Sequence, residues 1–251
     1  MLRLTLALIL LITPLAAEEV VLGLSQEEVA ITATFDGDDI LIFGAVKREK
    51  PIPDGDPLEV IVAVAGPSEP LTVRRKDKRL GICVNVDAVV IDEAPSFYAV
   101  ASTGPLSEVL SNTEDLRHKI SINRAIRFVG APDGITDSGK FTEALIRIRK
   151  NAELYQTLEN NVDLAQQTLF RTQIDMPANL VEGGYKTRIF LTRNGQVIDS
   201  YERVIDVRKV GLERWLYNMA HGTPLLYGLM SLAIAIAAGW GASAAFRAIK
   251  G

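Results

Sequence analysis

Two histidines and one cysteine in a sequence of 251 residues limit the chemistry that the chain can perform. Glu114 and His118 stand four residues apart and would share one face of a helix, where they could form half of a metal site with Asp115 beside them. No further histidine or cysteine nearby completes a typical zinc or iron ligand set, and His221 borders an apolar segment near the C-terminus. A salt-bridged helical histidine is the simpler interpretation. We therefore expect no metal, no cofactor and no catalytic residue, since Ser and Cys nucleophiles usually need a histidine base.

Cys83 is the single cysteine, so it cannot form a disulfide within the chain. It stands in the alternating run 80–86, which favours a small buried strand residue over a reactive thiol. The turn at 130–134 has neither the lysine nor the spacing of a phosphate-binding loop. The acidic segment Asp36–Asp39 could hold calcium through oxygen ligands, but a turn between strands is the simpler interpretation.

The N-terminus has the features of a secretory signal peptide. Arg3 is followed by an apolar run at 4–12, a proline and small residues before an acidic start. This order predicts a signal peptide of residues 1–17, cleaved after Ala17. The apolar run is about half of the roughly 20 residues that span a bilayer, so an uncleaved anchor is the weaker interpretation.

The C-terminus predicts a membrane anchor. Residues 223–246 contain no charged side chain and are long enough to cross the hydrocarbon core as a helix. Arg247 and Lys250 follow at once, as the positive-inside rule favours for a cytoplasmic tail at 247–251. With a cleaved signal, residues 18–209 then form a periplasmic domain, joined by a juxtamembrane segment at 210–222 to a single inner-membrane helix.

The charge of the exported domain argues against one class of partner. All 31 acidic residues lie between Glu18 and Ala220, but only 24 of the 27 basic ones do, since Arg3, Arg247 and Lys250 lie outside this stretch. Its net charge is thus near −7, from 24 basic and 31 acidic residues. Nucleic-acid-binding domains carry basic surfaces, so we expect no nucleic-acid partner.

The domain reads as mainly β. Alternating runs at 29–35 and 40–46, separated by the Asp36–Asp39 turn, predict a first hairpin. Shorter strands follow at 58–64, 71–73, 80–86, 88–91 and 97–101. Near the end, Asn194-Gly195 between two apolar runs is the strongest hairpin signal in the chain, because both central residues of a type I′ turn need positive φ. Short strands at this spacing, ending in a Pro-to-Gly-Gly corner and a tyrosine, predict an immunoglobulin-like β-sandwich.

A helical insertion interrupts these strands at about 104–161. A short helix is expected near Thr113–Lys119, with Asn112 or Thr113 as its N-cap. The stretch Lys140–Leu158 has apolar residues at helical spacing and predicts an amphipathic helix. Two smaller β domains joined by helices are the alternative architecture.

Two surface features could serve interactions. The first is a run of basic residues at 74–79. It could be a docking patch for anionic lipid or an acidic partner, or a charged hairpin tip that protects a sheet edge. It comprises Arg74, Arg75, Lys76, Lys78 and Arg79. On the membrane helix, small residues recur every fourth position and could allow close helix packing with a permease or a second copy. They are Ala233, Ala237, Gly241 and Ala245.

Four segments resemble one known family. They are Glu27–Gly37, Ile42–Ala45, Ala94–Val100 and Thr113–His118, and they look like the Alph_Pro_TM family of alphaproteobacterial transmembrane proteins. The resemblance runs over nearly the whole chain. Genes of this family often lie beside permeases similar to the sulfite exporter group, which implies a permease partner. The family defines no functional residues, so none is carried over.

These observations predict a non-enzymatic, single-pass inner-membrane protein with a periplasmic interaction domain, acting as an accessory partner of a sulfite-exporter-like permease. The alternative is a periplasmic enzyme, or a metal or sulfur-ligand binder, using Glu114, Asp115, His118 or Cys83. A purely structural envelope module is a third reading. The ligand, the partner's identity and the oligomeric state are not specified by the sequence.

Overall fold

The computed structural model describes residues 19–24, 28–31, 37–48, 55–130, 137–209 and 212–250. The predicted signal peptide at 1–17 lies outside this range, as does Asp36 of the acidic turn. The chain divides into two compact units. The first comprises Met1–Val29 with Asp36–Val207, and the second Ala30–Phe35 with Arg208–Gly251.

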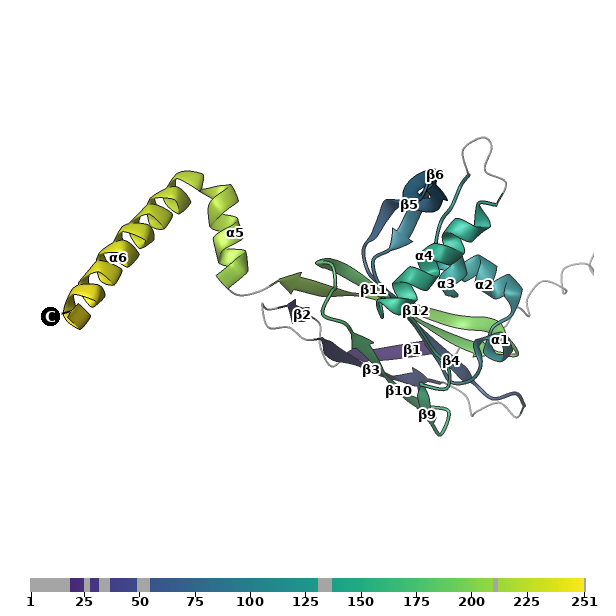
Figure 1. Cartoon of the computed structure of the whole chain (residues 1–251). Coiled ribbons are helices and arrows are strands. Elements are labelled where there is room, and N and C mark those ends of the chain that lie inside the picture. The colour runs from purple at the N-terminus through teal and green to yellow at the C-terminus, as the bar shows by residue number, and fades with distance from the viewer. Residues whose placement is uncertain are drawn as a thin grey trace, which may run out of the picture. The chain divides into compact units, whose positions relative to one another are not determined.

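Two main β-sheets build the first unit (Figure 1). The first sheet contains β1 (Glu19–Leu24), β3 (Asp38–Lys47), β10 (Leu169–Met176) and β9 (Asp163–Ala165), in that spatial order. The second has the order β2 (Glu28–Ile31), β12 (Gln196–Lys209), β11 (Gly183–Arg193), β4 (Glu59–Ala65), β7 (Tyr98–Ser102) and β8 (Tyr155–Leu158). Its β7–β8 pairing is parallel, whereas in the first sheet β3 pairs antiparallel with β1 and β10, and β10 pairs antiparallel with β9. The mainly β fold predicted from the sequence is confirmed.

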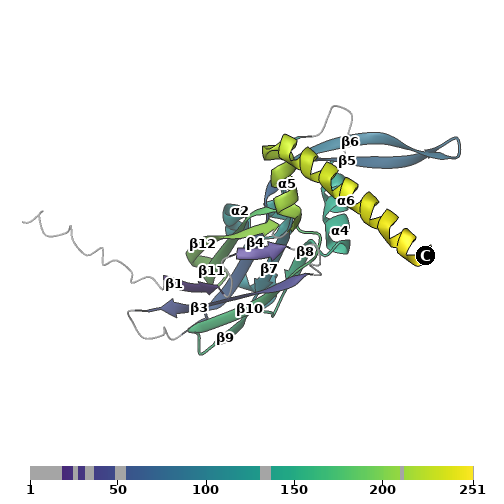
Figure 2. The ribbon, with the colours of Figure 1, turned by 90° about the vertical axis from the view of Figure 1, so that its left-hand side faces the viewer.

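The core follows from strand periodicity. Along β10 every second residue is buried, among them Phe170, Ile174 and Met176, as expected for a strand with one face on the core. The central strand β4 is buried on both faces from Val60 to Val64. Such a strand must be covered on its second face as well. Figure 2 shows the two sheets as layers of one unit with helices beyond the second sheet.

Those helices occupy the predicted insertion. They are α1 (Leu106–Val109), α2 (Asn112–His118), α3 (Ile122–Ala125) and α4 (Gly139–Asn151). In α4, Phe141 and Leu145 are buried as the apolar spacing predicted, but Ile148 is exposed. The helix expected over Lys140–Leu158 ends at Asn151, so that expectation was wrong for its last two turns. Glu153 adopts a φ of 60°, which breaks the helix, and Tyr155 then starts strand β8.

The closing hairpin agrees with the sequence. Asn194 and Gly195 have φ values of 53° and 70°, as a type I′ turn requires, and they join β11 to β12. The fully buried Tyr185 donates a hydrogen bond of 2.8 Å from its hydroxyl to the carbonyl oxygen of Val181. A tyrosine bonded to backbone a few residues upstream also occurs in immunoglobulin-like sandwiches, so the architecture is compatible with that description.

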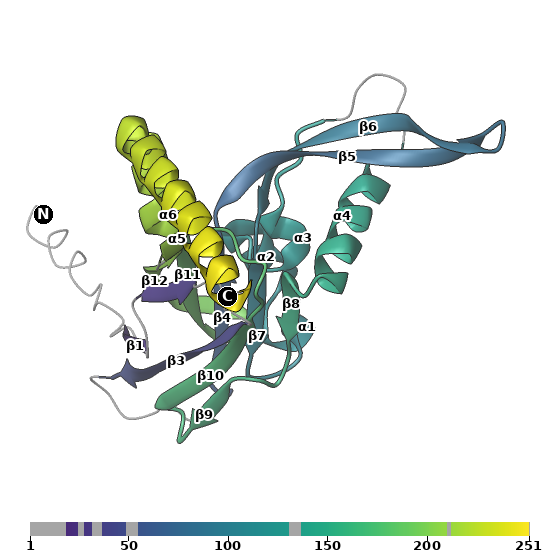
Figure 3. The same ribbon diagram turned by 60° about the vertical axis from the view of Figure 1, so that its left-hand side comes forward.

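Two other predictions about the strands were wrong. The strands at 29–35 and 40–46 do not form a hairpin: β3 pairs with β1 and β10, and β2 lies beside β12 in the other sheet. The chain thus changes sheets between Ile31 and Asp38. The expected strands at 80–86 and 88–91 are one strand, β6 (Ile82–Pro95), which pairs with β5 (Ser68–Arg79) in a separate long hairpin (Figure 3). The register of this pairing shifts between Arg75 and Lys76, where Val86 of β6 is left without a partner on β5.

The second unit contains α5 (Leu212–Gly222) and α6 (Pro224–Lys250). Within α6, the segment Pro224–Ser243 has a mean hydropathy of 1.7 over a length of 20 residues. None of it is buried inside the protein, which separates it from the core helix of a soluble domain.

Candidate functional site

A cleft of about 770 Å³ opens in the first unit on the helix-covered side of the second sheet. Four parts of the chain line it: the junction from β4 to β5, the junction from β6 to β7, the segment from α2 to Phe128, and one face of β11. Its volume lies in the range of small-molecule sites. Five of the lining side chains are basic and only one, Glu93, is acidic. The basic residues are Lys119, Arg124, Arg127, Lys186 and Arg188.

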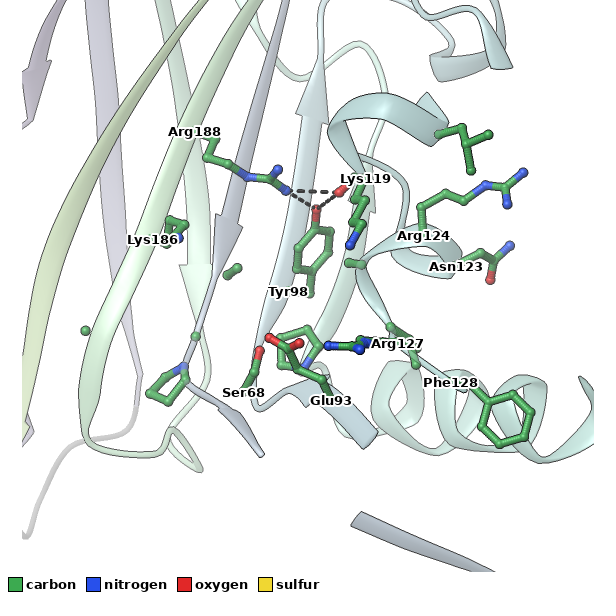
Figure 4. Close-up of a pocket in the computed structure, with 18 residues that line it drawn as sticks. Ser68, Glu93, Tyr98, Lys119, Asn123, Arg124, Arg127, Phe128, Lys186 and Arg188 are labelled. Atoms are coloured by element: carbon green, nitrogen blue, oxygen red, sulfur yellow. Dashed lines mark hydrogen bonds between the residues drawn. The ribbon is translucent and has the colours of Figure 1, made fainter. Parts of the chain in front are cut away.

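Arg188 fixes one wall of this cleft (Figure 4). Its guanidinium donates hydrogen bonds to the carbonyl oxygens of His118 at 2.6 Å and Lys119 at 3.0 Å, and to the Tyr98 hydroxyl at 3.0 Å. The Tyr98 hydroxyl in turn donates to the carbonyl oxygen of Ile120 at 2.8 Å. Arg188 therefore attaches the end of α2 to the sheet, because carbonyl groups at a helix C-terminus attract a cation.

Burial raises the pKa of Tyr98 to about 12, against a smaller lowering by the nearby Arg188 charge. The hydroxyl thus remains protonated at neutral pH and can keep donating to Ile120 while it accepts from Arg188. The wall of the cleft is therefore a fixed, fully protonated network.

The other four basic side chains differ in their partners. Lys186 pairs with Glu202 at 3.2 Å, and Arg124 approaches Asp115 at 4.0 Å. The side chains of Lys119 and Arg127 make no hydrogen bond or ion pair within the described part of the chain. The Arg127 backbone forms an isolated bridge with Glu93, which holds its position at the rim. Two cations are thus available to an anionic group in the cleft.

Sequence reasoning missed this cleft, although a signal was present. Residues 116–132 contain four basic residues and no acidic one, in a domain that is acidic as a whole. Three of the basic residues that line the cleft come from this segment. The other two, Lys186 and Arg188, come from a strand about 60 residues later and reach the cleft only through the sheet order.

The small residues on the candidate membrane helix are exposed. Ala233, Ala237 and Gly241 are exposed on α6, and a Cβ added at Gly241 would meet nothing within 4 Å. Ala245 lies beyond Ser243, the last residue of α6 whose side chain is described. The predicted stripe is therefore open to a partner along the part of α6 that the structure describes.

A family match covers almost the whole chain. The family described as "Putative transmembrane protein (Alph_Pro_TM)" matches residues 19–248, which include both units. The chain belongs to this family. No curated protein matches the chain. Membership in Alph_Pro_TM and the exposed apolar helix α6 together make the chain a membrane protein with one candidate spanning helix among its described residues.

The carboxylates on the helix of Glu114 and His118 in this Alph_Pro_TM protein pair mainly with neighbours in sequence, although the buried Oε2 atom of Glu114 accepts no hydrogen bond from the described residues. Glu114 is 7% exposed and contacts Arg117 at 2.6 Å and His118 at 3.3 Å. Asp115 accepts hydrogen bonds from the backbone N–H groups of Ile120 and Ser121 and from the Ser121 hydroxyl. Among the described residues, no three His, Cys, Asp or Glu side chains gather as metal ligands would. The N-cap of α2 is Ser111, not Asn112 or Thr113 as expected; its side chain accepts from the N–H of Glu114.

Cys83 is exposed, so the expectation of a buried strand residue was wrong. It lies on β6 opposite Lys78, near the tip of the β5–β6 hairpin. Alternation of apolar residues indicates burial only where a second layer covers the strand, and this part of the hairpin has none.

The predicted basic patch divides into two parts. Arg75 is half-buried and held by the folded unit: it bonds Asp87 and Asp137, and its guanidinium lies 5.0 Å from the centre of the Phe141 ring. Arg75 holds the pKa of the Asp137 carboxyl below its ordinary value, with Lys140 adding to the effect. Arg74, Lys76, Lys78 and Arg79 are all exposed on the hairpin.

The acidic turn is described only in part. The Asp39 carboxylate accepts a hydrogen bond of 2.6 Å from Gln173 on the neighbouring strand. Asp39 also pairs in register with Asp175, whose pKa is raised by burial and by the nearby Asp39.

Proposed function

We propose that this protein is a non-enzymatic accessory subunit of the inner membrane, anchored by the single helix α6, with its folded unit in the periplasm and a permease of the sulfite-exporter kind as its partner. In this proposal the folded unit binds an anionic ligand in the cleft and thereby links the ligand to the partner.

The observation that carries the proposal is the charge of the cleft. Five basic side chains line it, although the domain as a whole is acidic. Guanidinium and ammonium groups bind carboxylate, sulfate or phosphate groups strongly, because both the charge and the N–H geometry match. Lys119 and Arg127 supply charges that no other described residue neutralises, and Arg188 holds the wall in place.

Two further points support the membrane partner. The small residues Ala233, Ala237 and Gly241 are open on α6, and small residues are the usual contact of associating membrane helices. The Alph_Pro_TM family also implies a permease neighbour through the position of its genes. The predicted signal peptide and the basic residues Arg247 and Lys250 support the periplasmic orientation.

The ligand claim can be tested on the full chain in nanodiscs, with inorganic sulfate as the probe and sodium chloride of equal ionic strength as the salt control. Bound sulfate should raise the unfolding temperature of the folded unit, because a ligand that binds only the native state stabilises it. The double variant Lys119→Gln with Arg127→Gln should lose this shift.

The matched control is Lys150→Gln with Arg147→Gln, which removes the same two residue types from the exposed side of α4. It should keep the sulfate effect of the wild type. If sulfate raises the unfolding temperature equally in both double variants, the cleft is not the sulfate-binding site.

A further inference from the structure

The β5–β6 hairpin extends beyond its last contact with the rest of the folded unit. Arg75, bound to Asp87 and Asp137, marks that contact. From Lys76 to Asn85 no side chain is buried. Figure 3 shows the two strands projecting from the unit past α4. At about 3.3 Å per residue, the tip at Leu80 lies roughly 17 Å beyond Arg75.

The tip carries apolar side chains that no core explains. Leu80 is 105% exposed and Ile82 is 65% exposed. Leu80 and Gly81 form the turn, with φ values of 51° and 86°. The left-handed conformation is unfavourable for leucine, and glycine or asparagine would serve the turn better. A leucine that is strained and completely exposed does not contribute to folding, which points to a role in contact with something outside the unit.

The charges behind the tip have one dominant sign. Lys76, Lys78 and Arg79 stand against the single acidic residue Asp77. Asp77 contacts Arg79 at 3.4 Å, with both side chains well exposed. Lys78 lies about 7 Å and Lys76 about 13 Å behind Leu80 along the strand. An apolar end followed by cations at this depth matches the interface of an anionic bilayer, where apolar groups bury about 5–10 Å and cations meet the headgroups.

We propose that the tip of the β5–β6 hairpin binds the anionic lipid surface, with Leu80 and Ile82 inserted below the headgroups and Lys76, Lys78 and Arg79 bound to lipid phosphates. This inference goes beyond the ligand cleft and the permease partner, and it needs only that α6 anchors the chain in a membrane.

Two observations favour lipid over an acidic protein as the occupant. Only the segment between Lys209 and Pro224 joins the folded unit to α6, so the sequence that links the unit to a bilayer-spanning helix is short. The tip is also a narrow end of two strands, whereas a stable protein interface buries about 800 Å² on each side. Insertion into a lipid interface requires only a small apolar end with flanking charge.

The single cysteine allows a direct test on the full chain. A nitroxide attached to the exposed Cys83 reports its depth through relative collisions with oxygen, which is enriched in lipid, and with a water-soluble nickel chelate. The chain is reconstituted in nanodiscs of phosphatidylcholine alone or with phosphatidylglycerol. We expect the label to lie in lipid in the anionic nanodiscs and in water in the zwitterionic ones. A label at Leu169→Cys, in a Cys83→Ser background, should stay in water in both, because Leu169 is exposed on β10 away from the hairpin.

Two double variants separate the contributions of the apolar and the charged side chains to insertion of the tip. Lys78→Gln with Arg79→Gln should lower the ratio of inserted to free tip roughly 30-fold in the anionic nanodiscs. Leu80→Ser with Ile82→Ser should leave the label in water. Circular dichroism checks that each variant is folded.

The proposal is overturned if the Cys83 label stays in water in anionic nanodiscs, or if the charge variant inserts as well as the wild type. The Cys83 label could instead be shielded from the nickel chelate only when native membrane proteins are present, and not in anionic nanodiscs that hold this chain alone. That result would assign the tip to an acidic protein and would also overturn the proposal.

Discussion

Arg75 binds Asp137 through two hydrogen bonds of 2.7 and 3.1 Å, and this pair connects the β5–β6 hairpin to the start of α4. The same guanidinium bonds Asp87 on the neighbouring strand and lies over the Phe141 ring. A bidentate arginine of this kind fixes orientation as well as position. The hairpin therefore has a rigid base and an unsupported tip, which is the arrangement that a projecting contact element needs.

Asp137→Asn should loosen the base of the hairpin. The Asp137 pKa is lowered in the folded protein, so its contribution to stability is complete above the ordinary value of 3.8 and is lost as the pH falls through the lower folded value. Amide hydrogen exchange around Arg75 should therefore be faster in the variant at pH 7, with a smaller difference in strong acid. Asp163→Asn, which removes an exposed pair with Arg171, is the control and should leave the hairpin unchanged.

Alkaline titration should show three late tyrosines, since burial raises the pKa of Tyr185 as well as those of Tyr98 and Tyr155. Burial raises the pKa of both Tyr98 and Tyr155 to about 12. Because these folded values lie above the ordinary value of 10.0, the stabilisation is complete below pH 10 and is lost as the pH rises through 12. For Tyr98 this contribution to the free energy of unfolding amounts to about 3 kcal/mol. Tyrosinate absorbance measured with far-ultraviolet circular dichroism should show these groups titrating with unfolding. Ionisation of all six tyrosines near pH 10 with the fold intact would contradict this.

Two glycine substitutions should have opposite signs. Gly195→Ala should destabilise the folded unit by roughly 1–2 kcal/mol, because φ is +70° and the new Cβ would lie 3.0 Å from the Ser111 nitrogen. Gly139→Ala should stabilise it by about 0.5 kcal/mol, because that glycine starts α4 and a Cβ there meets nothing within 4 Å. Urea unfolding of the two variants measures both. Equal effects would show that the Asn194-Gly195 turn is not strained as described.

The stripe of small residues on α6, which includes Ala237 and Gly241, can be tested by comparing substitutions on it with substitutions on the opposite face of the helix. Ala237→Leu with Gly241→Leu should weaken association of the helix by at least tenfold, because added side chains prevent close approach. Ala235→Leu with Gly239→Leu makes the same two changes about 200° around the helix and should leave association intact. Retention of the partner in mild detergent is the readout. Equal retention of both double variants would exclude the stripe as the contact.

Sequence patterns predicted what depends on local chemistry. Asn194-Gly195 predicted its turn because only a few residues accept positive φ, and residues 223–246 predicted a spanning helix because apolar length alone decides it. Failures occurred where a partner distant in sequence decides the outcome. Cys83 was expected to be buried, because the alternation of its strand does not show that the second layer is missing.

The cleft illustrates the same limit. Lys119 and Arg127 come from the helical insertion and Arg188 from a strand about 60 residues later, and only the sheet order brings them together. Likewise, Tyr155 fitted the stripe of a long helix and is buried as that stripe required, but as the first residue of β8. Its parallel pairing with β7 depends on a contact nearly 60 residues away in sequence.

The most direct test of the proposed accessory role is affinity purification of the full-length protein from its native membrane in mild detergent, followed by mass spectrometry and stoichiometry of what remains bound. We expect a permease to copurify with the protein at a fixed molar ratio. The Ala237→Leu with Gly241→Leu variant should lose this permease, and the Ala235→Leu with Gly239→Leu control should keep it. Recovery of the protein alone, under conditions that keep other membrane complexes intact, would contradict the proposed role.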